Sequence, residues 1–413
     1  MRSKNIPQGY KQTELGIIPE DWAVKTIGSL GYTYSGLSGK RKSDFGSGNA
    51  KYIPFLNILT NTQIDTNNLE SVCVSNTEHQ NNVAKGDLFF NTSSETPEEV
   101  GMCAVLSKDC PNTYLNSFCF GFRPFENNGA NGIYLSYFFR GNSGRKLMSV
   151  LAQGATRHNL SKTNLLESSI YLPPIAEQRA IAEALSDVDG LIASLDKKIA
   201  KKRLLKQGAM QQLLTGKKRL PGFTDEWVDT SIGEGVRFQV GYPFQSQYFT
   251  SDRIGKRLVK NRDLKSDDQI VFYNGEYDYK FIVHNGDILI GMDGDFLPYK
   301  WDKGIALLNQ RVGRLLPTKK WDLSFVMYAL IEPLQKLQDG TGATTVKHLS
   351  HNDIEQMVLC IPQNYEEQQA IATILSDMDK EIADLEAQRD KYRLLKSGMM
   401  QKLLTGQIRL KTE

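Results

Sequence analysis

The sequence predicts an α+β fold. Two tandem domains of mixed α/β structure are expected to be separated by two long antiparallel, coiled-coil-like helices, in a pseudo-twofold symmetric arrangement. Three observations lead to this prediction. The chain has 413 residues, a length that suggests two or three domains. It contains an internal repeat, and each copy of the repeat carries a proline-free apolar pattern of helical period.

The repeat is clearest in two matched stretches. Residues 177–182 (EQRAIA) correspond to 367–372 (EQQAIA), and 213–216 (LLTG) recur as 403–406. Upstream of these stretches the matches are weaker and their spacing drifts, so insertions and deletions have accumulated there. We expect the constant stretches to perform one task twice, and the variable parts to differ in what they contact.

Both constant stretches are predicted to be long helices. Prolines precede each one, and Gly216 and Gly406 follow, as is typical of helix ends. Their narrow apolar seam needs a partner helix, and we expect the two helices to pair with each other. The alternative is two unrelated surface helices, each packed on its own domain. The seam residues are Ile181, Leu185, Val188, Ile192, Leu195, Ile199, Ile371, Leu375, Met378, Ile382 and Leu385.

The predicted division of the chain has four parts: a first domain over 1–174, a first helix over 175–216, a second domain over 217–360 and a second helix over 361–413. Within the domains, short segments rich in β-branched or aromatic residues predict strands at 52–59, 87–90, 114–122, 287–290 and 305–315. Helices are expected at 134–147 and 323–337, and polar loops at 35–49, 91–98 and 291–295. The chain stops soon after Gly406, and the continuation expected there from the first copy resembles 17–22 at the start of the chain, so we expect the two ends of the chain to lie near each other.

Composition narrows the class of protein. Hydrophobic residues make up 40% and charged residues 23% of the chain, values typical of a folded globular protein. The five cysteines are odd in number and lack C-x-x-C spacing, which argues against a disulfide framework and a zinc ribbon and favours a reducing cytoplasm. No apolar stretch is long enough to span a membrane.

Basic residues cluster on the first helix and in the domains. Nine of them lie between Asp196 and Arg219, either as a solvated helix face or as a surface for an acidic partner or nucleic acid. In the domains, basic and amide side chains in polar segments suit phosphate contact or base recognition. The candidate DNA-binding residues are Lys40, Arg41, Lys42, Ser43, Arg157, His158, Asn159, Arg253, Arg257, Lys260, Asn261, Arg262, Lys347 and His348.

No catalytic motif emerges from the sequence. A lipase-type nucleophile elbow, a phosphate-binding loop and the usual tetrapeptide of amino-methyltransferases are all absent. His348 and His351 could serve a metal, but nothing similar accompanies His158. We therefore predict no catalytic residues, no metal and no cofactor. Two alternatives stay open: a metal-dependent nuclease using Asp268, Asp278 and Lys280, and a purely structural coiled-coil adaptor.

Several motifs together carry a family resemblance: 16–22 (GIIPEDW), 174–178 (PIAEQ), 185–189 (LSDVD) and 206–216 (KQGAMQQLLTG), with second copies at 365–368 and 401–406. Over essentially its whole length the chain resembles the specificity (S) subunits of Type I restriction–modification systems. The resemblance implies two target-recognition domains, each of which recognises one half of a bipartite site in double-stranded DNA. It also implies helices that act as spacer and docking surface for two methyltransferase (M) subunits, with restriction (R) subunits as further partners. Such a subunit directs adenine methylation and cleavage without catalysing either.

Overall fold

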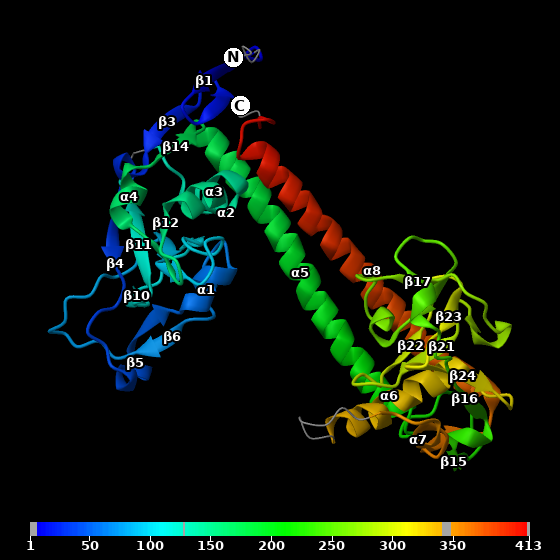
Figure 1. Cartoon of the computed structure of the whole chain (residues 1–413). Helices are drawn as coiled ribbons and strands as arrows, with labels where there is room; N and C mark the ends of the chain where they lie inside the picture. The colour runs from blue at the N-terminus through cyan, green and yellow to red at the C-terminus, as the bar shows by residue number, and fades with distance from the viewer. Residues whose placement is uncertain (1–5, 127–128, 341–347, 411–413) are drawn as a thin grey trace. The chain divides into compact units, whose positions relative to one another are not determined.

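The structure is a computed structural model that describes residues 6–126, 129–340 and 348–410 (Figure 1). These residues form two compact units. Unit 1 comprises Met1–Leu195 and Gln388–Glu413, and unit 2 comprises Asp196–Ala387. Both long helices cross the boundary between the units, so each unit contains part of both. The four-part division expected from the sequence remains a prediction.

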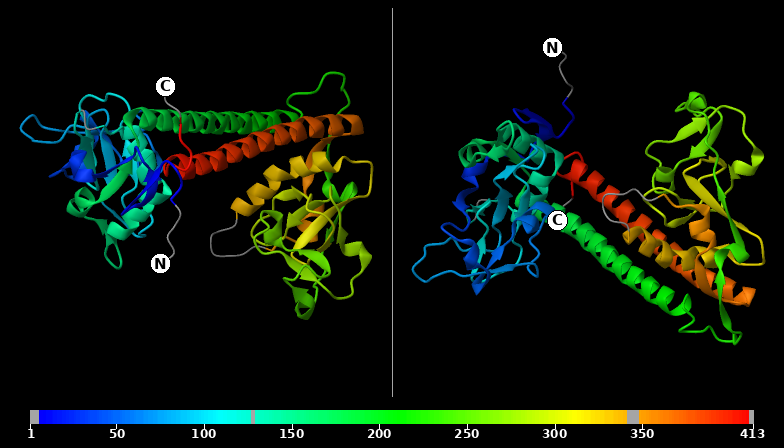
Figure 2. Two further views of the ribbon diagram at one scale, coloured as in Figure 1. Left: turned by 90° about the horizontal axis from the view of Figure 1, so that it is seen from above. Right: turned by 60° about the horizontal axis from the view of Figure 1, so that its bottom comes forward.

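The long helices are α5 (Ile175–Leu213) and α8 (Tyr365–Leu403), each of 39 residues. Within each unit their segments lie side by side and antiparallel, as Figure 1 and Figure 2 show. In unit 1, Lys396 of α8 pairs with Asp189 of α5 at 2.6 Å. In unit 2, Lys202 of α5 pairs with Glu381 of α8 at 2.7 Å. The predicted antiparallel pairing is confirmed.

The described residues of unit 1 contain fourteen short strands and four short α-helices besides the unit's parts of α5 and α8. Its strands are β1 (Tyr10–Thr13), β2 (Gly16–Pro19), β3 (Ala23–Thr26), β4 (Gly31–Ser35), β5 (Phe45–Ile53), β6 (Glu70–Val72), β7 (Leu88–Asn91), β8 (Ser93–Ser94), β9 (Cys103–Val105), β10 (Thr113–Leu115), β11 (Cys119–Pro124), β12 (Ala152–Gln153), β13 (His158–Leu160) and β14 (Ser169–Leu172). Its short helices are α1 (Phe55–Thr60), α2 (Gly132–Arg140), α3 (Asn142–Leu151) and α4 (Lys162–Glu167).

Unit 2 repeats much of this order. Its strands are β15 (Trp227–Ser231), β16 (Val236–Val240), β17 (Phe249–Thr250), β18 (Lys256–Val259), β19 (Val271–Tyr273), β20 (Ile282–Val283), β21 (Ile288–Gly291), β22 (Pro298–Lys300), β23 (Ala306–Leu308), β24 (Val312–Pro317) and β25 (Val358–Pro362). Its short helices are α6 (Leu323–Asp339) and α7 (His351–Glu355).

The same antiparallel sheet forms the centre of each unit. Its strand order is β4-β11-β7-β9 in unit 1 and β16-β24-β21-β22 in unit 2. Alternate residues of β7 in unit 1, and of β21 in unit 2, enter two different cores, because successive side chains on a strand point to opposite faces. In unit 1, Leu88 and Phe90 join the core that includes α2, while Phe89 faces the core around the second sheet. In unit 2, Ile290 joins the core that includes α6, while Leu289 faces the core around the sheet that contains β18 and β23.

A second sheet in each unit contains one parallel strand pair, β5 with β10 and β18 with β23. An outer two-stranded pair, β3 with β14 and β15 with β25, leads into the long helix that comes after it. These matched pairs show that the repeat in the sequence corresponds to a repeat in structure.

Several predicted elements differ from the structure. The segment 52–59 was expected to be one strand, but β5 ends at Ile53 and α1 begins at Phe55, because Pro54 cannot donate to a strand partner. The segments 114–122 and 305–315 each contain two strands separated by a turn. The predicted helix 134–147 is broken at Gly141 into α2 and α3, whereas α6 continues through Pro333.

The seam residues of α5 and α8 are all buried or half-buried. Ile181 and Leu185 lie in the core of unit 1 with Leu403 and Leu404, so this end of α5 packs on its own unit as well as on α8. Ile371 and Leu375 occupy the corresponding place in unit 2. The seam therefore joins each helix pair to the body of a unit, which the sequence pattern alone did not distinguish.

The segments next to the two ends of the chain meet within unit 1. The Tyr10 hydroxyl donates a hydrogen bond of 2.8 Å to the Gly406 carbonyl oxygen. Arg409 contacts Asp21 at 2.7 Å. The expected proximity of the two ends is confirmed for these residues.

Candidate nucleic-acid interface

A buried glutamate fixes the start of each long helix. Glu177 is 2% exposed and accepts hydrogen bonds from Trp22 Nε1 at 3.0 Å and from both Nε and Nη2 of Arg409. In unit 2, Glu367 accepts two bonds of 2.7 Å from Arg219. The arginine in each case stands after the end of the other long helix, so the carboxylate links the two helices of a unit.

The glutamine after each glutamate serves a different contact. Gln178 donates to the Pro173 carbonyl oxygen and accepts from the backbone N–H of Asn131, immediately before α2. Gln368 makes the same two kinds of contact, with Pro362 and with Asp322 before α6. Each amide thus satisfies backbone groups at the junction of a long helix with a short one. The repeated Glu-Gln motif is therefore a structural junction.

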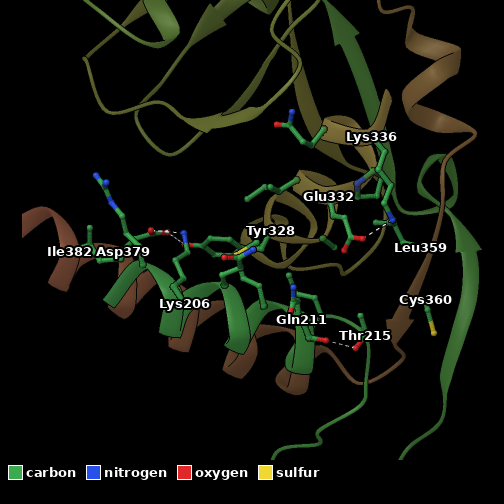
Figure 3. A pocket seen from close by; sticks show the side chains of 18 of the residues that line it. Lys206, Gln211, Thr215, Tyr328, Glu332, Lys336, Leu359, Cys360, Asp379 and Ile382 are labelled. Carbon is green, nitrogen blue, oxygen red and sulfur yellow. Dashed lines mark hydrogen bonds and ion pairs between the residues drawn. The ribbon is translucent and has the colours of Figure 1, made fainter. Parts of the chain in front are cut away.

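A tyrosine, an aspartate and a lysine form a second repeated cluster. In unit 2 the Tyr328 hydroxyl donates to Asp379 at 2.7 Å, and Lys206 pairs with the same carboxylate (Figure 3). In unit 1, Tyr137 donates to Asp189 at 2.7 Å, and Lys396 pairs with that carboxylate. Burial raises the pKa of both tyrosines well above their ordinary value, so the hydroxyls remain donors.

A hollow of about 1070 Å³ lies beside this cluster in unit 2, between α5, α6, α8 and β25 (Figure 3). Its wall includes Met210, Leu214, Leu359 and Ile382 together with the charged pair Glu332–Lys336. The hollow at the equivalent place in unit 1 is smaller, about 210 Å³, and Arg140 lines it. The two units therefore present related but unequal surfaces beside the helices.

The basic run on α5 is partly paired with acids of α8. Lys202, Arg203 and Lys206 form ion pairs with Glu381, Glu386 and Asp379 respectively. Arg219 pairs with Glu367. Lys197, Lys198 and Lys201 remain exposed on the helix surface. Four of the nine basic residues of the run thus connect α5, or the segment just after it, to α8.

In the loop of unit 1, the four candidate residues fall into two groups. Lys40 donates to the Cys73 carbonyl oxygen and pairs with Glu78, and this lysine lowers the pKa of Glu78 to about 2. Arg41, Lys42 and Ser43 are exposed. Among the described residues, Arg41 and Lys42 form no ion pair. These two cations are available for a polyanion, whereas Lys40 is neutralised internally.

The structure brings residues 157–159 beside strand β8. Asn159 lies opposite Ser93 and His158 opposite Ser94 in an antiparallel pair. Arg157 is exposed and donates from Nε to the Ser93 hydroxyl at 3.1 Å.

The equivalent place in unit 2 contains His348, which lies opposite Asp293. The structural counterpart of His348 is therefore Asn159, the residue that follows His158. The His348 ring contacts Asp293 at 2.8 Å, and Arg311 contacts the same carboxylate at 3.1 Å. Lys347 lies outside the described residues.

The basic segment of unit 2 is partly engaged in the fold. Arg257 pairs with Asp267 at 2.6 Å and stacks over the Trp301 ring. Lys260 lies over the Phe249 ring, and burial lowers its pKa. Arg253 is exposed, and Arg262 is exposed with its guanidinium on Gln269. Of the candidate residues in this segment, Arg253 and Arg262 are therefore the exposed cations.

Asn261 holds a loop. Its amide donates to the Asp293 carbonyl oxygen, and its Oδ1 occupies the space that a Cβ at Gly291 would need. In unit 1 the residue at the place of Gly291 is Asn91, whose amide donates to the Ser93 carbonyl oxygen. The two units thus stabilise the same loop with an asparagine from different elements, the end of β7 in unit 1 and the 3-10 helix Asn261–Leu264 after β18 in unit 2. Sequence comparison missed this exchange because the two asparagines occupy different positions in the repeat.

Sequence reasoning also missed Arg311, Arg219 and Arg409. Arg219 was counted within the basic run, and Arg409 was not considered. A signal was present, since Arg219 and Arg409 each stand at the same spacing after a copy of Leu-Leu-Thr-Gly. Arg311 gave no such signal, because no arginine stands at the corresponding place in unit 1.

The residues of the nuclease alternative do not assemble into a metal site. Asp278 and Lys280 pair with each other at 2.8 Å, and Asp268 accepts from the Ser266 hydroxyl. No group of three His, Cys, Asp or Glu side chains within 6–126, 129–340 and 348–410 has the geometry to hold a metal ion. No helix in the described part of the chain is both long and apolar enough to cross a membrane.

Comparison with known proteins identifies the family. The family model described as "Type I restriction modification DNA specificity domain" matches residues 19–202 and 244–392. The chain belongs to this family. It is a specificity subunit of a Type I restriction–modification system, the non-catalytic subunit that recognises a DNA sequence.

Relatives of this specificity subunit cover nearly its whole length in some cases and about half of it in others. The MjaVIII specificity subunit of Methanocaldococcus jannaschii is 24% identical and aligns over 98% of this chain and 97% of its own. The EcoBI specificity subunit of Escherichia coli is 28% identical over 45% of this chain and 40% of its own. The crystal structure of the S subunit from M. genitalium has a TM-score of 0.62 at 15% identity, and the match covers 95% of this chain and 97% of that one. That structural likeness supports the fold.

Proposed function

We propose that each unit recognises one half of a bipartite site in double-stranded DNA. The observation that carries this proposal is the duplicated unit. The central sheet, the Glu–Arg pair and the Tyr–Asp–Lys cluster recur in both units. By contrast, the side chains on the loops differ, as with Ser93 in one unit and Asp293 in the other. Constant scaffolds with different loops suit two recognition modules that read different sequences.

The exposed cations supply the sequence-independent part of DNA binding in this proposal. Arg41 and Lys42 in unit 1, and Arg253 and Arg262 in unit 2, contact backbone phosphates and so set the position of each unit on the duplex. Their affinity depends on salt, because each phosphate contact releases counterions.

The long helices have two proposed roles. As continuous helices shared by both units, they set the spacer between the half-sites. They also dock two methyltransferase subunits, one beside the Tyr–Asp–Lys cluster of each unit, where a hollow adjoins the helices, with a largely apolar wall in unit 2 and a more polar one in unit 1. Two like surfaces suit two copies of one partner. Those partners methylate adenine, restriction subunits add cleavage, and the complex works in the cytoplasm.

An exchange of one unit's recognition part tests this proposal. Residues 27–168, between β3 and β14, are replaced by the equivalent residues of another family member, and methylated adenines are mapped in the presence of the methyltransferase. The expected result is one changed half-site and one unchanged half-site. Alteration of both half-sites, or of neither, would contradict the proposal. The reciprocal exchange of residues 232–357 is the matched control and should change the other half.

A further inference from the structure

A polar cleft of unit 1 lies between α1 and the loop after β7. Its volume is about 770 Å³. One wall is formed by Phe55 and Leu59 of α1, and the other by Ser93, Ser94, Glu95 and Glu99. Thr156 and Arg157 complete the lining. All of these residues belong to unit 1.

Two half-buried arginines hold the walls of this cleft in place. Arg140 of α2 donates to the carbonyl oxygens of Ile58, Leu59 and Asn61 at the end of α1. Its counterpart on the other wall is Arg145 of α3, which donates to the carbonyl oxygens of Glu98, Val100 and Gly101. Burial lowers the pKa of both guanidinium groups, although they stay protonated. Each arginine is committed to backbone acceptors, a role that fixes loop geometry.

Asn91, the last residue of β7, also fixes the loop that follows this strand. It is fully buried and donates to the carbonyl oxygens of Ser93 and Glu99, while its Oδ1 accepts from the backbone N–H of Met102. The loop is therefore fixed at both ends and in the middle. A cleft whose walls are preorganised in this way loses little conformational entropy when it binds a ligand.

The lining carries both donors and acceptors. Arg157 is exposed, and the Ser93 hydroxyl accepts a hydrogen bond from its Nε. This contact does not use the two terminal nitrogens of the guanidinium group. Glu95 and Glu99 are exposed, and Glu99 accepts from the Ser94 hydroxyl at 3.2 Å. Among the described residues, Arg157 forms no ion pair with either glutamate.

This combination disfavours phosphate and favours a base edge. Two carboxylates repel a phosphate, whereas contacts to the DNA backbone come from cations and from neutral hydrogen-bond donors. In the major groove, arginine donates to the O6 and N7 acceptors of guanine, and glutamate accepts from the N4 amino group of cytosine. An arginine beside two glutamates matches the pattern that a G·C pair presents.

We propose that this cleft is the base-reading site of unit 1 and that Arg157, with Glu95 or Glu99, recognises a G·C pair in its half-site. This inference rests on the proposed function of unit 1 and specifies where that unit reads sequence. Arg140, Arg145 and Asn91 are positioning residues for the cleft. Arg157 is the specificity-determining residue.

Methylated adenines are mapped for the native chain, Arg157→Gln and Glu95→Gln/Glu99→Gln, each with the methyltransferase present. The expected result for Arg157→Gln is about a tenfold or greater loss of preference for guanine at one position of one half-site. The double glutamate variant should relax the preference for cytosine on the complementary strand. The other half-site should stay unchanged in both variants, and thermal unfolding confirms that each is folded.

Two comparisons separate the possible failures. Lys25→Gln removes an exposed cation on β3 and should leave both motif and methylation level unchanged. A phosphate contact at Arg157 would weaken methylation evenly across sequences and reduce the salt dependence of binding, with the motif intact, and that result would overturn the inference. If exchange of residues 27–168 changes a half-site while Arg157→Gln leaves it intact, the inference fails and the proposed function stands. If the exchange itself changes neither half-site, the proposed function fails.

Discussion

Glu177 and Arg409 form a bidentate ion pair in unit 1, with Nε–Oε1 and Nη2–Oε2 distances of 2.6 and 2.7 Å, although they lie 232 positions apart in the chain. Glu177 begins α5, and Arg409 stands after the end of α8. The pair Glu367–Arg219 reverses these roles in unit 2, where the glutamate begins α8 and the arginine stands after α5. Each unit therefore joins the start of one helix to the end of the other.

Loss of Arg409 is expected to destabilise unit 1 selectively. The Arg409→Met variant leaves Glu177 charged in a place where it is 2% exposed, which should cost about 2–4 kcal/mol. Urea unfolding combined with segment-resolved hydrogen exchange measures this cost. Asp21→Asn removes the exposed partner of the same arginine and should cost less than about 1 kcal/mol. Equal losses of unfolding free energy in the two variants would show that the contact of Arg409 with Glu177 contributes no more to stability than its contact with Asp21.

The acid side of the pH–stability profile should contain a contribution from Asp267. Hydrogen bonds from Arg257 and Lys303 lower the pKa of this carboxyl from 3.8 to about 2. Because the folded-state pKa is the lower one, the contribution is present above pH 3.8 and is lost as the pH falls towards 2. The side chain is 45% exposed, so the contribution should stay below about 1 kcal/mol. Carboxyl NMR titration should show the pKa returning towards its ordinary value in Arg257→Gln. A pKa near 3.8 in the native chain would contradict the contact.

Reversal of the Asp189–Lys396 pair tests the register of the helices in unit 1. Asp189→Lys alone places two cations together and removes the acceptor of the Tyr137 hydroxyl, so it should lower stability by about 1–3 kcal/mol. Adding Lys396→Asp restores opposite charges and should recover part of that loss in a double-mutant cycle. Additive losses in the double variant would mean that the two side chains do not interact in solution. The same exchange at Asp379 and Lys206 provides the matched test in unit 2.

Lengthening both long helices should lengthen the spacer of the DNA site. We insert four residues after Leu195 and four after Ala387, where the compact units divide, so that both antiparallel partners grow together. Four residues add about 6 Å of helix and nearly preserve its angular phase. At ~3.4 Å per base pair, the preferred spacer should grow by about one or two base pairs. Two-residue insertions rotate the downstream part of each helix by about 200° and should abolish methylation. Methylome mapping that returns the original spacer would exclude the helices as the ruler.

The sequence predicted the long helices well because their limits depend on local chemistry. Prolines at 173, 174 and 362 precede them, and Gly216 and Gly406 come after them with positive φ angles of 67° and 70°. Prediction failed where a single residue changed the outcome: Pro54 ends a strand, and Gly141 divides a segment that was expected to be one helix.

The candidate interface was harder to predict because the fate of a charge depends on distant partners. Lys40 and Arg41 are neighbours in sequence, yet among the described residues the Lys40 side chain forms an ion pair, with Glu78, and the Arg41 side chain forms none. Likewise Asn261 fills the space above Gly291, and no local pattern reveals that contact. Residue type and spacing indicated a basic segment, whereas tertiary structure determined which of its members remain accessible.

The most direct test of the bipartite account is genome-wide mapping of methylated adenines in cells that carry the native chain and its methyltransferase. The account predicts a motif of two short specified segments separated by an unspecified gap of roughly one helical turn. A single uninterrupted motif would contradict it.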